Sequence, residues 1–175
     1  AKLNAFIEIV ERLQEGGHRA LVFSQFVRHL TLLREWLDRN GVAYQYLDGA
    51  TPSKQRDERV DAFQSGADPL FLISLRAGGQ GLNLTAADYV IHMDPWWNPA
   101  VEDQASDRAH RMGQRRAVTI YRLIAAGTVE EQILALHKTK RTLAMGILEG
   151  ADTATALSAA QLLALMRGDE GAQAD

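Results

Sequence analysis

Two hydrophobic patterns alternate along the chain, one typical of helices and one typical of buried strands. Apolar residues recur every three or four positions over residues 3–13, a helical pattern that stops at Gly16 and Gly17. A continuous apolar run follows over residues 20–23, as in a strand buried on both faces. The same alternation continues along the chain. It predicts further helices over residues 26–37, 51–63, 98–112 and 128–148, and further strands over residues 42–47, 70–74, 89–93 and 118–124.

This order of elements predicts an α/β fold. Strands that alternate with helices are typical of a doubly wound, mostly parallel sheet between two layers of helices. Thr51 and Asn98 each precede a proline, which is the arrangement of a helix cap followed by a proline in the first turn. Thr128 and Glu131 have the spacing of a capping box that begins a long helix, and Ser158 begins a shorter one in the same way.

The long helix near the carboxyl terminus carries an apolar stripe that we expect to brace the domain. The stripe consists of Ile133, Leu136, Leu143 and Ile147. Beside it, Lys138, Lys140 and Arg141 are expected to form a solvated face rather than a nucleic acid site. We therefore divide the chain into a core domain over residues 1–127, bracing and terminal helices over residues 128–167, and a disordered tail over residues 168–175.

The composition limits the class of protein. Hydrophobic residues make up 46% of the 175 residues and charged residues 23%, the mixture of an ordinary globular domain. The chain begins with Ala1 inside a helical pattern, which suggests a piece of a longer protein. It has no apolar stretch long enough to span a bilayer and no secretory leader. We therefore expect no membrane partner and a cytoplasmic location, associated with the nucleoid if the source is bacterial.

Metal chemistry and strong electrostatic binding are both disfavoured. Cysteine is absent and the five histidines lie far apart in the sequence, so we expect no metal site. The net charge of −3 disfavours a free-standing nucleic acid binder, because such affinity comes largely from neutralised phosphates. Any contact with DNA must therefore be local, and we expect it to be weak for this chain alone.

Two arginines are the first candidates for chemistry. Gln104, Arg108 and Arg111 are spaced by four and three residues, which would put them on one face of the predicted helix. Guanidinium groups keep their charge and offer a planar donor fork to phosphate oxygens, as stabilisation of a phosphoryl-transfer transition state requires. The alternative is a solvated face on which Arg108 pairs with Asp107 or Glu102.

A glycine-rich loop follows the strand predicted over residues 70–74. Residues 78–81 read Gly-Gly-Gln-Gly, and we expect this loop at the carboxyl edge of the sheet, where open α/β domains bind ligands. Glycines allow backbone amides to approach a phosphate closely. The third glycine of a dinucleotide fingerprint is missing, which argues against that motif, and a flexible connecting turn remains the alternative.

Six strings in the same order resemble the motifs of Swi/Snf-type ATPases, which belong to helicase superfamily two. They are residues 21–26 (LVFSQF), 47–51 (LDGAT), 74–85 (SLRAGGQGLNLT), 94–99 (DPWWNP), 103–114 (DQASDRAHRMGQ) and 127–131 (GTVEE). The resemblance covers nearly the whole chain. It implies the carboxyl-terminal RecA-like lobe of a motor that translocates on double-stranded DNA and displaces or remodels bound proteins.

The resemblance also implies roles for individual residues. Arg108 and Arg111 would be arginine fingers that reach the phosphates of ATP, assisted by Gln104. The residues implied in ATP binding are Gly79, Gly81 and Asp107. The residues implied in contacts with the DNA backbone are Ser24, Gln25, Gly49, Thr51, Arg76, Asn83 and Thr85. Trp96 and Trp97 would shape the DNA-facing edge, and we expect at least one of them to be buried.

The usual phosphate cradle of a motor ATPase is missing, since the sequence contains no Gly-x-x-x-x-Gly-Lys-Ser/Thr string. In the family, an amino-terminal RecA-like lobe carries that cradle and most of the site for ATP and Mg²⁺. We therefore expect this chain to be inactive alone and to need such a lobe of its parent protein as partner. Two alternatives remain: the same lobe of a strand-separating helicase, or a non-enzymatic domain that binds a nucleotide or a partner.

Overall fold

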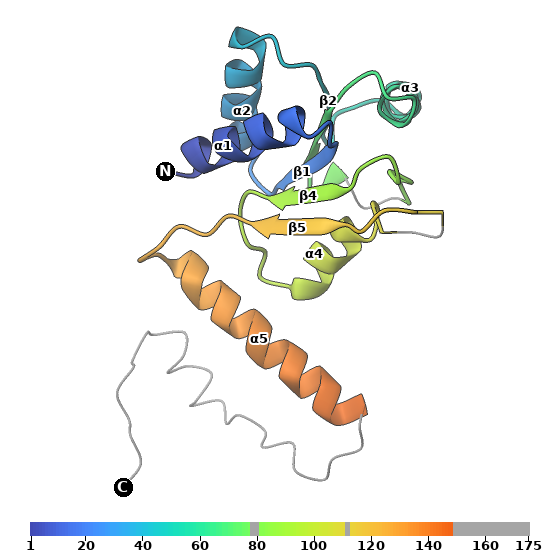
Figure 1. Cartoon of the computed structure of the whole chain (residues 1–175). Coiled ribbons are helices and arrows are strands. Elements are labelled where there is room, and N and C mark those ends of the chain that lie inside the picture. Colours follow the sequence, from blue (N-terminus) through green and yellow to red (C-terminus); the bar gives the residue numbers. More distant parts are fainter. Residues whose placement is uncertain (78–80, 111–112, 149–175) are drawn as a thin grey trace, which may run out of the picture.

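The computed structural model describes residues 1–77, 81–110 and 113–148, and a five-stranded sheet forms its centre. The strands are β1 (Ala20–Ser24), β2 (Tyr44–Leu47), β3 (Leu70–Ser74), β4 (Tyr89–His92) and β5 (Thr119–Arg122). They lie in the order β2-β3-β1-β4-β5, and each neighbouring pair is parallel. The predicted parallel sheet is therefore confirmed, with β1 at its middle (Figure 1).

Helices cover both faces of the sheet. The helices are α1 (Lys2–Glu15), α2 (Val27–Arg39), α3 (Ser53–Gln64), α4 (Pro99–Ser106) and α5 (Val129–Leu148). Residues of α1 and α2 pack in the core on one face, and residues of α3 and α4 pack in the core on the other. The longest helix, α5, extends away from the sheet on the side of β5 (Figure 1). The three-layer, RecA-like α/β fold is thus confirmed.

The side chains of the central strands alternate between two cores, because successive side chains point to opposite faces of the sheet. Leu21 and Phe23 of β1 join the core against α3 and α4, while Ala20 and Val22 join the core against α1 and α2. Every residue of β1 and β3 is buried. Each large apolar side chain buried in this way stabilises the fold by about 2 kcal/mol. The two cores together fix the ends of the strands, from which the candidate loops leave.

The helix predicted over residues 98–112 is shorter in the structure. Its start is as predicted, since the Asn98 side chain accepts a backbone N–H of the first turn at 3.1 Å and a proline follows. The helix ends at Ser106, however. Arg108 therefore lies beyond the last helical turn, and the prediction that it shares a helical face with Gln104 is wrong.

The predicted cap of α3 is also wrong. Pro52 rather than Thr51 directly precedes the first helical residue, and no side chain caps this helix. The Thr51 hydroxyl instead lies in the turn after β2, where it accepts the Asp48 N–H at 3.1 Å. Strand β2 is shorter than predicted because its pairing with β3 begins only at Tyr44, opposite Leu70. Pairing with a distant strand sets the start of β2, whereas local hydrogen bonds between Asp48 and Thr51 hold the turn before α3.

The start of α5 is close to the predicted capping box. Thr128 Oγ1 accepts the N–H of Glu130 at 3.2 Å, and the Glu131 carboxylate accepts the N–H of Gly127 at 3.0 Å. In the predicted box these two acceptors would bond to the N–H groups of Glu131 and Thr128, so each bond goes to the residue one position earlier. The terminal helix and the tail predicted within residues 158–175 lie outside the described residues. Within the part of the chain that the structure describes, no helix has the length and apolar character needed to cross a bilayer.

Candidate functional site

The candidate residues gather at the edge of the sheet where the parallel strands end. Ser24 is the last residue of β1, Ser74 the last of β3 and His92 the last of β4. The loops that follow these strands contain Gln25, the glycine-rich segment and the tryptophan pair. Parallel strands bring their following loops to one side of the molecule, and open α/β domains bind ligands there.

A buried carboxylate organises the loop after β1. Asp94 is only 2% exposed, and it accepts hydrogen bonds from the Ser24 hydroxyl and from the Gln25 N–H, the latter at 2.9 Å. The Gln25 side chain donates to the Pro95 carbonyl at 3.2 Å. Ser24 is fully buried, so its hydroxyl faces the protein and holds the loop. Sequence reasoning missed Asp94 as an anchor, although its position directly after a predicted strand is a usable signal.

The turn after β2 contains two further candidates, Gly49 and Thr51. Asp48 accepts the Ala50 N–H at 2.9 Å and the Thr51 hydroxyl at 3.2 Å. Burial alone would raise the pKa of Asp48, but hydrogen bonds from Tyr46, Ala50 and Thr51 outweigh burial and lower that pKa below its ordinary value. The ionised Asp48 carboxylate therefore holds the turn in a conformation that leaves Gly49 exposed.

The loop after β3 presents an exposed cation and an exposed amide. Arg76 and Asn83 are both exposed, whereas Leu82 and Leu84 are buried. Two apolar anchors on either side of Asn83 therefore fix the point from which its side chain reaches solvent. A guanidinium and an amide are both suitable donors to phosphate oxygens.

Three other candidates belong to the same loop. The Thr85 hydroxyl accepts a hydrogen bond from the Gln64 side chain at 3.2 Å, so it also ties the loop to α3. Gly81 has a φ of +39°, which a side chain would strain, and this explains the need for glycine there. Gly79 lies outside the described residues.

The segment after α4 is joined to the loop after β3 by hydrogen bonds. The Arg108 carbonyl accepts the Leu84 N–H at 3.0 Å. The Gln114 side chain adds a second connection, because its amide group donates to the carbonyls of Thr85 (2.9 Å), Ala87 (2.8 Å) and Ala109 (3.0 Å). Sequence reasoning missed Gln114, and no local pattern identifies it. The two segments therefore form one hydrogen-bonded unit.

The candidate ATP-side residues differ in exposure. Gln104 and Asp107 are exposed at the end of α4. Arg108 is only 3% exposed, so its guanidinium lies inside the lobe rather than in solvent. Arg111 lies outside the described residues. Of the six residues predicted on the ATP side, three therefore lie at the end of α4 or just after it, and their different burial points to different roles.

The tryptophan pair forms the loop after β4. Trp96 is partly buried against the core and Trp97 is 50% exposed, so the expectation of a buried tryptophan is met only in part. The backbone N–H of Trp96 donates to the fully buried Glu102 carboxylate at 2.8 Å. That carboxylate also accepts a hydrogen bond from Arg122 Nε at 3.0 Å. Because Glu102 and Arg108 are both buried, the solvated-face alternative is wrong.

His92 is a buried titratable group beside α4. Its ring is fully buried, stacks on Phe23 with 5.6 Å between ring centroids, and places Nε2 at 3.0 Å from Ser106 Oγ. Burial lowers the pKa of His92 to about 4, although the nearby Glu102 carboxylate opposes the shift. His92 is therefore neutral at physiological pH and joins β4 to the end of α4.

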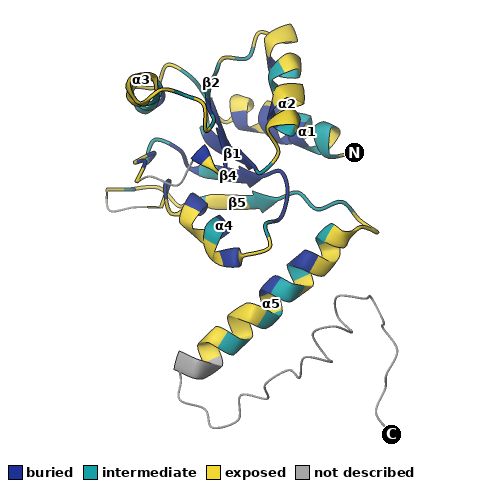
Figure 2. Cartoon of the chain, turned by 180° about the vertical axis from the view of Figure 1, so that it is seen from behind, coloured by how far each residue is buried: buried dark blue, intermediate teal, exposed yellow. Residues whose placement is uncertain are grey.

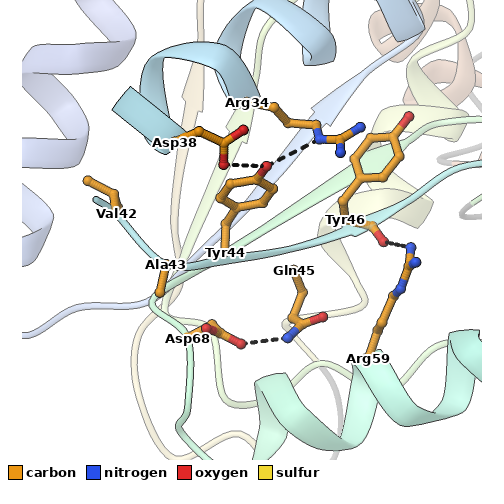
Figure 3. A pocket seen from close by; sticks show the side chains of 9 residues that line it. All are labelled: Arg34, Asp38, Val42, Ala43, Tyr44, Gln45, Tyr46, Arg59 and Asp68. Carbon is orange, nitrogen blue, oxygen red and sulfur yellow. Dashed lines mark hydrogen bonds between the residues drawn. The ribbon is translucent and has the colours of Figure 1, made fainter. Parts of the chain in front are cut away.

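A shallow pocket lies elsewhere, along the edge strand β2 and between α2 and α3 (Figure 3). Its polar side chains satisfy one another. The Tyr44 hydroxyl donates to Asp38 at 2.9 Å and accepts from Arg34 at 3.3 Å, and Gln45 donates to Asp68 at 2.6 Å. This pocket is separate from the candidate loops. Among the described residues, no group of histidines and carboxylates could hold a metal ion.

The fold and the edge loops define a class of protein. Residues 1–113 match the helicase conserved C-terminal domain, and the chain belongs to this family. The match covers the sheet strands β1 to β4 and ends before β5 and α5.

The relatives of the chain are Swi/Snf-type ATPases, as the motifs predicted. It is 43% identical over 171 residues to the human chromatin-remodeling ATPase INO80, which covers 97% of this chain and 11% of INO80. It is 40% identical over 162 residues to YwqA of Bacillus subtilis (strain 168), named as a candidate ATP-dependent helicase/translocase, which covers 92% of this chain and 18% of YwqA. The chain therefore spans less than one fifth of each of these relatives.

A solved structure is similar as well. The crystal structure of the C-terminal part of the Fun30 ATPase domain superimposes with a TM-score of 0.74 at 35% identity. The superposition covers 78% of this chain and 45% of the Fun30 chain. Sequence and structure thus agree on the family.

Proposed function

We propose that this chain is the second motor lobe of an ATP-dependent translocase that acts on double-stranded DNA. The observation that carries the proposal is the hydrogen bond between the Leu84 N–H and the Arg108 carbonyl, at 3.0 Å. It joins a loop with exposed Arg76 and Asn83, which suit the phosphates of DNA, to a segment whose arginines suit the phosphates of ATP. ATP hydrolysis and grip on DNA can then influence one another through a single unit.

ATP and Mg²⁺ would be held mainly by an amino-terminal RecA-like lobe of the parent protein. The 175 residues contain no P-loop string, which is the usual cradle for the phosphates. The carboxyl edge of this lobe would face that partner, and ATP would lie between them. Gly79, Gly81 and Asp107 would line the ATP site from this side. The lobe alone is accordingly expected to be inactive.

Two arginines would stabilise the charge that develops on the phosphates during hydrolysis. Arg108 is buried when the lobe stands alone. It can act as a finger only if docking of the partner lobe draws its side chain out; otherwise it supports the segment that carries Arg111. Gln104, exposed at the end of α4, would assist at the phosphate or at the attacking water.

The proposed DNA contacts are to the phosphate backbone and are therefore independent of base sequence. Arg76, Asn83 and Gly49 are exposed and can approach phosphates directly. Ser24 ends β1 and Gln25 begins the loop after it, and internal hydrogen bonds hold both residues, so they would contribute by fixing the shape of that loop. Because the net charge is −3, the grip is local and reversible, as stepping along a duplex requires.

The test is ATP turnover by the intact parent protein, with and without double-stranded DNA. Arg108→Ala and Arg111→Ala are compared with Arg115→Ala, a matched control because Arg115 is exposed and its loss changes the charge equally. A finger is worth a factor of about 10³ to 10⁵ in turnover, so its loss should abolish DNA-stimulated hydrolysis while the control retains it. Lysine should not restore the rate, because it lacks the planar fork.

Thermal unfolding separates the two possible roles of Arg108. A loss of turnover at an unchanged melting temperature identifies Arg108 as a finger. If Arg108→Ala lowers both quantities while Arg111→Ala lowers turnover alone, Arg111 is the finger and Arg108 its support. If double-stranded DNA does not stimulate ATP turnover, the translocase proposal is contradicted. Release of a labelled strand from a duplex would instead favour the strand-separating helicase.

A further inference from the structure

The helix α5 projects from the lobe, and few of its residues over 129–145, where burial is described, are buried. Figure 2 shows it largely exposed, with short buried patches in the half nearer to the sheet. Those positions are Ile133, 5% exposed, and His137, 1% exposed, which lie one helical turn apart. Ile133 belongs to the apolar stripe predicted from sequence, whereas His137 does not.

Two polar contacts of α5 reach the backbone of the tryptophan loop. His137 Nε2 bonds to the Trp96 carbonyl, and because a carbonyl only accepts, this nitrogen carries the proton. Lys140 Nζ donates to the next carbonyl, that of Trp97, at 3.2 Å. Two successive peptide groups of the loop are thus held by side chains one turn apart on α5.

A third contact anchors α5 to α4. Arg141 forms an ion pair with Asp103 at 2.9 Å. Lys138, Lys140 and Arg141 are exposed, as predicted for a solvated face, and Lys140 and Arg141 also contact the tryptophan loop and α4. Exposed ion pairs contribute little energy, so the buried His137 is the stronger anchor.

The same loop is held from its other side by α4. The backbone N–H of Trp96 donates to the buried Glu102 carboxylate at 2.8 Å, while the backbone carbonyl of Trp96 accepts a hydrogen bond from His137. The peptide on each side of Trp96 is therefore fixed by a buried side chain from a different helix. The neighbouring Trp97 is 50% exposed, so the position of its ring depends on a backbone that α4 and α5 hold jointly.

We propose that His137 is a positioning residue through which docking of α5 sets the Trp96–Trp97 loop, and thereby the response of the motor to DNA. The inference rests on the proposed function, in which this loop shapes the DNA-facing edge. A displacement of α5 would release the Trp96 carbonyl while the Trp96 N–H stayed bonded to Glu102. The loop would then lose its fixed orientation without disturbance of the sheet.

Two variants of the intact ATPase isolate the hydrogen bond. His137→Leu removes the donor but keeps a comparable apolar volume, whereas His137→Gln retains an amide N–H able to reach the carbonyl. Lys138→Ala is the control, because Lys138 is an exposed neighbour on the same helix. Hydrogen exchange of the peptide over residues 94–98 reports the loop directly. We expect exchange about tenfold faster in His137→Leu, and wild-type exchange in His137→Gln and the control.

Kinetics report the consequence for the motor. In His137→Leu, the DNA concentration for half-maximal turnover should rise about tenfold, while turnover without DNA stays at the wild-type value. His137→Gln should restore the wild-type response. Unchanged exchange in His137→Leu, or equal impairment of the Leu and Gln variants, overturns the inference. A wild type that DNA does not stimulate refutes the proposed function instead, and the exchange measurement still decides the role of His137 in the loop.

Discussion

Acidification should destabilise the lobe through His92. Burial lowers the pKa of this histidine to about 4, against an ordinary value of 6.5. Its Nδ1 has no hydrogen-bond partner among the described residues, so an added proton there would be buried without an acceptor. The neutral ring is therefore the form that the fold accommodates.

The size of the effect follows from the two pKa values. Between pH 6.5 and pH 4 the unfolded chain binds a proton that the folded chain does not, so stability rises with pH in this range. The contribution of His92 is present above pH 6.5 and is lost as the pH falls toward 4. From pH 7 to pH 5 the loss amounts to about 2 kcal/mol. For a chain of this size, that loss lowers the melting temperature by about 4 to 8 °C.

Thermal unfolding followed by circular dichroism at pH 5, 6 and 7 measures this loss, with His92→Gln as the comparison. Glutamine does not titrate and can still donate toward Ser106. The variant should be less stable than the wild type at pH 7, because the stack on Phe23 is lost, but it should lose less stability on acidification. If both proteins lose the same free energy between pH 7 and pH 5, His92 is not the responsible group and the reasoning is refuted.

Two further substitutions test the anchors of the edge loops. Asp94→Asn should lower the free energy of unfolding by about 1 to 3 kcal/mol, because the Ser24 hydroxyl and the Gln25 N–H bond to different carboxylate oxygens and an amide replaces one of these oxygens with an NH₂ donor. Urea unfolding measures the loss, with Asp107→Asn at an exposed position as the control, expected within about 0.5 kcal/mol of wild type. Equal losses in the two variants would contradict this. Gln114→Ala removes the donor to three carbonyls and should speed hydrogen exchange over residues 84–87 about tenfold, whereas unchanged exchange would show that the loop holds its shape without it.

The end of α4 illustrates how tertiary contacts overrode a local pattern. Residues 103–112 contain no helix breaker, so a helix to residue 112 is the natural prediction. In the structure the Arg108 carbonyl instead bonds to the Leu84 N–H, and His92 contacts Ser106 at the last helical residue. These partners lie far from α4 in the sequence, and no local periodicity can reveal them.

The anchors of the site were the least predictable part. Asp94, Gln114 and His137 each bond to backbone groups of a segment distant in the sequence. Asp94 has one local signal, its position directly after a predicted strand, whereas the immediate neighbours of Gln114 and His137 do not distinguish them from ordinary polar residues. The capping residue Asn98 could be predicted because its partner lies two residues away.

The order of strands and helices, the parallel α/β class and the motifs that identify the family could all be predicted from the amino-acid sequence. These features depend on side-chain period, on residues that start or stop helices and on short strings, all of which are local. Only the tertiary structure decided where α4 ends, that Arg108 is buried, and that α5 holds the tryptophan loop. Those outcomes depend on hydrogen bonds and burial between segments distant in the sequence, and such contacts exist only once the chain has folded.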